Sequence, residues 1–199
     1  MASPLYVLCV LGMASVVSVQ GYFTDIGFEL RNSPCPNIPQ IGDFNMSRYS
    51  GVWYERKRFQ FALQSNVKCM TYTLFERNDG GFNLVYYREV RWPLPLQTST
   101  RIVLEPTSKS GTFRAKTRVN GNWVFVGVFT IVQPGYEDPS VMYACRDLFY
   151  GTAIEASWIV KRDRQALTPT EESTLQSAVT SYGISYSKYQ TSDQSSCGR

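Results

Sequence analysis

The cysteines are the residues whose number and spacing could carry out chemistry, because the 199-residue chain contains five cysteines and no histidine. Without histidine, Ser-His and Cys-His nucleophilic catalysis and imidazole-ligated metals are excluded. No Cys-x-x-Cys pair of the kind that holds structural zinc occurs. We therefore expect no catalytic residue and no metal site. The four cysteines beyond the N-terminal segment are Cys35, Cys69, Cys145 and Cys197.

The N-terminal segment of residues 1–20 has the character of an export signal. It carries no charge and contains an apolar stretch over residues 5–14, followed by small residues. Cleavage near Gln20 or Gly21 would remove Cys9. An N-terminal membrane anchor is the alternative, but the stretch is short for one, and no other segment is long and apolar enough to cross a membrane. We predict a secreted, extracellular protein with one domain over residues 21–199.

Secretion changes how the remaining cysteines are interpreted. Four widely spaced cysteines behind an export signal predict two disulfides, and the residues alone permit three pairings. The net charge is +4 and the basic residues are scattered, which argues against a nucleic-acid partner.

Eight short strands must position any functional side chain. They are rich in β-branched and aromatic residues and are separated by turn sequences. This spacing predicts an all-β fold, an eight-stranded antiparallel up-and-down barrel, and a β-sandwich is the alternative. The expected strands are 51–59, 68–76, 82–90, 100–104, 112–118, 122–132, 140–145 and 153–161.

One C-terminal α-helix follows the strands. Thr168 is placed to cap it, with Pro169 at the first helical position and Glu171 completing a capping box. An apolar stripe that includes Leu175 and Val179 recurs at helical spacing, so we expect the helix to pack on the barrel wall.

The connecting loops predict which end of the barrel is open. In an up-and-down barrel alternate loops share an end, and every second loop here carries large apolar residues. Such contiguous apolar surface marks a ligand mouth or a partner site. A barrel of about eight strands can hold one small ligand. The expected rim residues are Phe61, Leu63, Trp92, Leu94, Trp123 and Phe149.

Two motifs at the ends of the strand series resemble the lipocalin family. Gly51 and Trp53 form a Gly-x-Trp at the start of the first strand, and Arg162 follows the last strand. In lipocalins an arginine at that place packs across the tryptophan, a cation–π contact. The resemblance implies structural roles for these three residues and a barrel that carries a hydrophobic ligand.

The resemblance is closest to the lipocalin branch that contains apolipoprotein D, the insect bilin-binding proteins and the crustacyanins. It is carried by the segments 35–37, 141–145, 167–172 and 191–197. That branch implies the pairs Cys35–Cys145 and Cys69–Cys197. The chain departs from the family at residues 134–136, which read Pro-Gly-Tyr instead of Thr-Asp-Tyr, and this puts in doubt any receptor contact through that surface.

Strand alternation, with its phase set by the resemblance, predicts the ligand pocket. Ordinary core packing is the alternative for each residue. The expected lining is apolar with a few hydroxyl groups, as suits a flat or elongated ligand of limited polarity. The predicted lining residues are Met70, Tyr72, Leu74, Val85, Tyr87, Phe113, Ala115, Val128, Thr130, Val141 and Tyr143.

Three functions of different classes follow from these features. The first is a carrier that needs no cofactor. Among its ligand classes a bilin or carotenoid chromophore ranks ahead of a sterol, a retinoid and a fatty acid. The second is an interaction protein whose rim docks on a lipid particle, a membrane surface or another subunit, including a copy of itself. The third is a lipocalin-like enzyme, which would require a free thiol or an activated carboxylate inside the barrel.

Asn45 lies in the sequon Asn45-Met46-Ser47 and is the expected glycosylation site.

Overall fold

The computed structural model describes residues 28–60, 66–91, 96–137 and 139–198. The expected export signal lies outside these ranges. In chain order the described elements are β1 (Glu29–Arg31), α2 (Met46–Tyr49), β2 (Gly51–Phe59), β3 (Val67–Glu76), β4 (Phe82–Val90), β5 (Leu96–Pro106), β6 (Thr112–Val119), β7 (Asn122–Gln133), β8 (Ser140–Asp147), η2 (Phe149–Gly151), β9 (Ala153–Lys161), α3 (Pro169–Ser181), η3 (Tyr186–Lys188) and β10 (Tyr189–Thr191).

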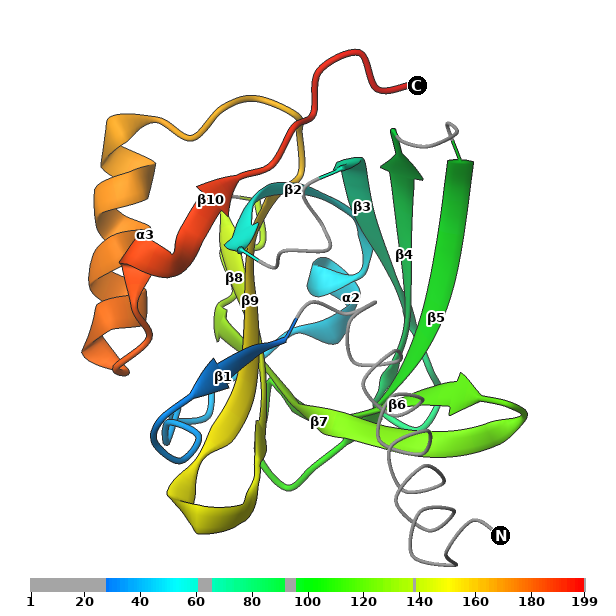
Figure 1. The fold of residues 1–199 in the computed structure, drawn as a ribbon, viewed down its shortest axis with the longest axis vertical. Coiled ribbons are helices and arrows are strands. Elements are labelled where there is room, and N and C mark those ends of the chain that lie inside the picture. Colours follow the sequence, from blue (N-terminus) through cyan, green and yellow to red (C-terminus); the bar gives the residue numbers. More distant parts are fainter. Residues whose placement is uncertain (1–27, 61–65, 92–95, 138, 199) are drawn as a thin grey trace, which may run out of the picture.

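Strands β2 to β9 form a closed barrel (Figure 1). Each strand pairs antiparallel with the next along the chain, and β9 pairs back onto β2 to complete the ring. Closure leaves no exposed edge among these eight strands. The predicted up-and-down barrel is confirmed, and the sandwich alternative is wrong.

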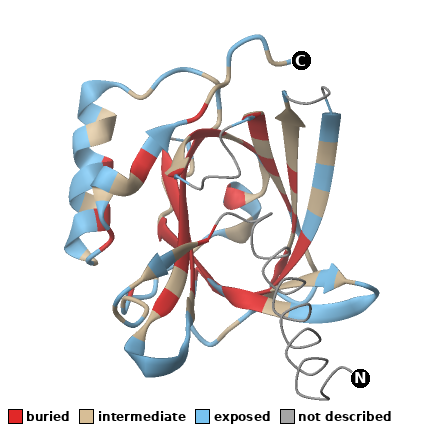
Figure 2. Ribbon diagram, viewed as in Figure 1, coloured by how far each residue is buried: buried red, intermediate tan, exposed pale blue. Residues whose placement is uncertain are grey.

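The barrel interior is a core of large apolar side chains. Trp53 and Leu74 are fully buried and belong to one cluster with Phe82 and Met142. At one end the short helix α2 brings Tyr49 against Trp53, with ring centroids 4.8 Å apart. Figure 2 shows that the buried residues follow the ring of strands. This end of the barrel is therefore closed by aromatic packing.

Helix α3 covers part of the outer wall, as predicted. The Thr168 hydroxyl accepts a hydrogen bond from the Glu171 backbone N–H, and the Glu171 carboxylate accepts one from the Thr168 N–H. These two bonds satisfy donors that a helix start otherwise leaves without partners. Leu175 and Val179 form a second apolar cluster with the outward-facing Val141 of β8. Barrel strands under the helix are thus buried on both faces.

The C-terminal tail forms part of the barrel wall, which the strand pattern did not predict. Strand β3 pairs with β2 only over the first half of β2, and β10 pairs with the second half. Beyond β10, the Ser192 N–H donates to the Arg56 carbonyl at 3.0 Å, and the Cys69 N–H donates to the Asp193 carbonyl at 2.9 Å. The tail therefore lies between β2 and β3 where these two strands diverge.

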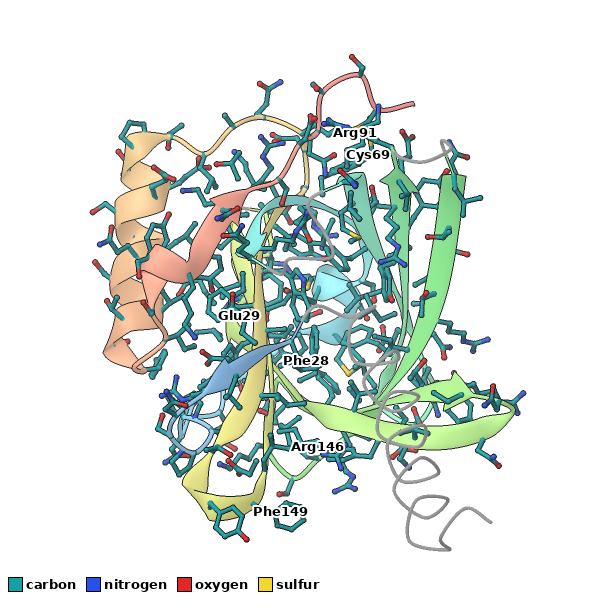
Figure 3. The ribbon with its side chains drawn as sticks, in the orientation of Figure 1. Phe28, Glu29, Cys69, Arg91, Arg146 and Phe149 are labelled. Carbon is teal, nitrogen blue, oxygen red and sulfur yellow. A yellow bond between two sulfur atoms is a disulfide. The ribbon has the colours of Figure 1, made fainter. Side chains whose placement is uncertain are left out.

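Two disulfides fix the two ends of the described chain to the barrel. Cys35 is bonded to Cys145 of β8, and Cys197 is bonded to Cys69 of β3. These are the two pairs that the resemblance implies. The second bond holds the tail in the gap between β2 and β3, and Arg91 adds an ion pair to Asp193 beside it (Figure 3).

Candidate ligand-binding site

The closed end of the barrel is built around Arg162. Its guanidinium carbon lies 3.7 Å from the centre of the Trp53 ring. Its N–H groups donate to the carbonyls of Arg48, Val52 and Tyr136 at 2.6, 3.1 and 3.1 Å. Gly51 has a φ of +97°, and a Cβ there would lie 3.4 Å from an Arg162 nitrogen. These residues seal this end of the barrel, and none of them lines the interior cavity.

A cavity lies inside the barrel above this closed end. Its walls are apolar side chains from β3 to β9, and its free volume is about 30 Å³. Phe129 and Trp158, which both line the cavity, stack on each other with ring centroids 6.3 Å apart. The lining residues are Phe28, Met70, Tyr72, Leu84, Tyr86, Ile102, Ala115, Val126, Gly127, Phe129, Ala144 and Trp158.

Five of the predicted pocket residues face the interior. Met70, Tyr72 and Ala115 line the cavity. Leu74 and Phe113 are buried in the same interior cluster, closer to the closed end where Phe113 contacts Phe82. Strands β3 and β6 therefore have the predicted phase over these residues.

The prediction for β4 was wrong by one residue. Tyr72 pairs with Tyr86 and Leu74 pairs with Leu84, and directly paired residues share a face of the sheet. Val85 and Tyr87 therefore face outward and are partly exposed. Both faces of this strand carry apolar or aromatic residues, so alternation alone did not distinguish them.

The prediction for β7 was also wrong, and a β-bulge explains it. Gly127 pairs with Ala115 and Phe125 with Lys116, so Val126 is an extra residue between the two pairs. Beyond the bulge, Phe129 faces the cavity, whereas Val128 and Thr130 line a hollow on the outer wall.

On β8 the predicted residues are buried, but on the outer side. Val141 and Tyr143 belong to the cluster beneath α3, and Ala144 lines the cavity instead. Because α3 and the segment around Cys35 cover this wall, both faces of β8 are apolar. The alternation of polar and apolar residues therefore does not show which residues of β8 point into the barrel. Ile102 of β5, Trp158 of β9 and Phe28 were also missed, and no pattern in the sequence singles out Phe28.

A buried carboxylate lies beside the cavity. Glu55 of β2 accepts hydrogen bonds from Arg58 and Ser192, both at 2.6 Å, and from the Tyr72 hydroxyl. Burial, and then the nearby Glu55 carboxylate, raise the pKa of Tyr72 well above its ordinary value of 10. Tyr72 therefore stays protonated and donates to Glu55, which leaves an apolar ring face toward the cavity.

The predicted rim is described only in part. Phe61, Leu63, Trp92 and Leu94 lie outside the described residues. Trp123 is 51% exposed and Phe149 is 84% exposed, and Figure 3 shows Phe149 at the outer edge of the molecule. The neighbouring Leu148 and Tyr150 are exposed as well, so a patch of large apolar side chains surrounds the β8–β9 connection.

Asn45, the predicted glycosylation site, is exposed and caps α2. Its side chain accepts a hydrogen bond from the Arg48 N–H at 2.8 Å, and its own N–H donates to the Tyr136 hydroxyl at 2.7 Å. Tyr136 belongs to the Pro-Gly-Tyr segment that departs from the family pattern, and the connection between β7 and β8 still packs against α2. Glycosylation at Asn45 stays a prediction.

Within the described ranges, no group of three acidic, cysteine or histidine side chains could hold a metal ion. Among those same residues no helix is long and apolar enough to cross a membrane.

Comparisons with known proteins agree with this geometry. No family model matches the chain. Apolipoprotein D from Cavia porcellus is 27% identical over 166 residues, which cover 82% of this chain and 84% of that protein. The chain has the fold of the lipocalins and is similar in sequence to a member of that family. The same fold is found in lobster apocrustacyanin A1 (TM-score 0.67, 17% identity, covering 84% of this chain and 92% of that one). Insecticyanin from the tobacco hornworm Manduca sexta gives a TM-score of 0.66 at 16% identity, covering 85% of this chain and 91% of that one.

Proposed function

We propose that this lipocalin is an extracellular carrier that holds a small hydrophobic ligand inside the barrel by burial alone. The observation that carries the proposal is the apolar cavity lined from seven successive strands, β3 to β9. The lipocalins to which this chain is similar are carriers of hydrophobic ligands. Burial of apolar surface supplies the binding energy at about 25 cal/mol per Å², and the proposal requires no acid, base or nucleophile.

The lining favours a flat, conjugated ligand. Aromatic rings from four strands bound the cavity, namely those of Tyr72, Tyr86, Phe129 and Trp158. Stacked aromatic faces bind planar π-systems well. A bilin or carotenoid therefore remains the first ligand class we propose, ahead of a sterol, a retinoid and a fatty acid.

The proposal includes export of the chain and removal of residues 1–20. Both disulfides form in an oxidising compartment. Mass spectrometry of the secreted protein would test this, because removal of residues 1–20 leaves an N-terminus at Gly21 and any glycan at Asn45 adds mass. An intact Met1 on the mature protein would overturn the signal-peptide assignment.

The first experiment is an absorption spectrum and a native mass of the protein purified from its source. A visible band, with added mass matching a tetrapyrrole or carotenoid, would establish the pigment. A colourless protein without such mass would remove that class, and extraction would then identify any sterol, retinoid or fatty acid.

A pair of variants tests the location of the site. Ala144→Phe fills the cavity from β8, and we expect it to abolish binding of a neutral fluorescent probe such as N-phenyl-1-naphthylamine. Val128→Phe places the same ring on the outer face of β7, where Val128 is 39% exposed, and should leave binding unchanged. Equal binding by both folded variants would place the site elsewhere.

A second candidate function is docking through the rim, favoured by the exposed Phe149, Tyr150 and Trp123. Replacing Phe149 and Trp123 with serine should weaken binding to phospholipid vesicles and leave probe affinity intact. Unchanged vesicle binding, or a loss of probe affinity alone, would count against docking.

A further inference from the structure

One residue that lines the cavity does not belong to the barrel. Phe28 precedes β1, is 7% exposed, and packs in the same cluster as the interior side chains. The other eleven lining residues come from β3 to β9. A side chain from outside the barrel therefore occupies part of the space in which we place the ligand.

Strand β1 holds Phe28 in this position. It pairs antiparallel with the first half of β9 over three residues, with Leu30 opposite Ile154. Glu29 forms an ion pair with Lys188 at 3.3 Å, and Arg31 forms one with Glu155 at 3.2 Å. In Figure 3, Phe28 lies toward the inside of the ring and Glu29 toward β10, as alternation along a strand requires.

With Phe28 in place, the cavity is too small for the proposed ligand. Its free volume of about 30 Å³ accommodates about two water molecules, whereas small-molecule sites have volumes of about 300–1,000 Å³. A ligand therefore requires a lining side chain to move. The other lining residues belong to strands of the closed ring, whereas Phe28 directly precedes a three-residue strand outside it.

We propose that Phe28 is an internal plug of the ligand cavity, and that a ligand must displace its ring to occupy the interior. This inference rests on the proposed carrier function. The disulfide between Cys35 and Cys145 keeps the N-terminal segment attached to β8 when β1 separates from β9. The plug is therefore always present at high effective concentration.

The plug also selects among ligands. When a ligand binds, the Phe28 ring leaves the cavity and the ligand becomes buried there. Only the difference between the apolar areas that the two bury contributes to affinity. Ligands no larger than a single ring gain nothing over Phe28. Extended molecules with several rings or a long conjugated chain bury more surface, and they are the class that displaces it.

The test compares Phe28→Ala with Leu30→Ala in the full secreted protein. Leu30 lies two residues away in β1 and is 63% exposed, so its removal leaves the cavity unchanged. We expect Phe28→Ala to lower the Kd for N-phenyl-1-naphthylamine by about tenfold, and Leu30→Ala to leave it at the wild-type value. Toluene should raise the thermal unfolding midpoint of Phe28→Ala and not that of the wild type, because an apolar vacancy binds such a ring.

Each outcome decides the matter. Equal probe affinity for wild type and folded Phe28→Ala, or weaker binding by the variant, would overturn the plug while leaving the carrier function intact. Stabilisation of both proteins by toluene would do the same. Failure of all three proteins to bind the probe would overturn the carrier function itself. Should Phe28→Ala not fold, Phe28→Leu retains an apolar side chain and is expected to bind with an intermediate Kd.

Discussion

Arg162 connects three segments through one side chain. Its guanidinium covers Trp53 and donates to backbone carbonyls before β2, in β2, and in the β7–β8 connection. We expect Arg162→Ala to lower the free energy of unfolding by about 2–4 kcal/mol, from the lost cation–π contact and charged hydrogen bonds. Denaturant titration measures this. Arg162→Lys keeps the charge but lacks the planar fork, so it should recover only part of the loss. A change within about 0.5 kcal/mol for the alanine variant would contradict this role.

Glu155 is a buried charge that contributes to the pH dependence of stability. Burial would raise its pKa, but hydrogen bonds from Lys188 and Tyr143 outweigh burial, and the pKa lies below its ordinary value of 4.5. A carboxyl with a lowered pKa stabilises the fold above its ordinary pKa, and this stabilisation is lost as the pH falls through the folded-state pKa.

Replacing Glu155 with glutamine should therefore be destabilising at pH 7, by on the order of 3 kcal/mol. The difference between wild type and variant should shrink below pH 4.5. Glu137→Gln is the control, because Glu137 is exposed and forms only a 3.9 Å ion pair with Arg48. A difference that stays constant between pH 7 and pH 3 would mean that the carboxylate charge plays no part.

At the scale of elements, the tail and its disulfide close the gap in the barrel wall between β2 and β3. The bonded Cys69 neighbours Met70, which lines the cavity. We expect the double variant Cys69→Ser, Cys197→Ser to lose about 2–4 kcal/mol of stability and to release a bound probe faster, because the gap in the wall opens.

The other disulfide supplies a matched control for this prediction. It closes a loop of similar length, with a sequence separation of 110 residues against 128, but it holds the N-terminal segment and not the tail between β2 and β3. Replacing Cys35 and Cys145 with serine should cost similar stability without faster release. Stopped-flow dissociation measurements distinguish the two, and equal release rates would contradict the role of the tail.

The same scale shows what the sequence could and could not predict. Turn residues between apolar runs located all eight barrel strands, and the capping box at Thr168 located α3. Which residues of a strand point into the barrel was harder to predict. The bulge at Val126 reverses the inward and outward alternation along β7, and the segments that cover β8 make both of its faces apolar. The β2–β10 pairing and the position of Phe28 depend on long-range packing, which periodicity does not report.

For the whole molecule, we expect ligand binding in the cavity to raise the stability of the folded state. A ligand that binds only the folded barrel should stabilise it by about 2.7 kcal/mol at a free concentration of one hundred times Kd. Thermal unfolding with increasing ligand measures this gain. Ala144→Phe, with its cavity filled, should show no ligand-dependent rise. A rise in that variant equal to the wild type would mean that the stabilising ligand binds outside the barrel.

The position of the tail has a consequence for synthesis. Ser192 and Asp193 bond to β2 and β3, and Cys197 bonds to the same β3. A ribosome makes the chain from the N-terminus, so the eight barrel strands emerge before the tail does. The barrel of a nascent chain therefore has an open seam until the tail, with Cys197, has emerged as well.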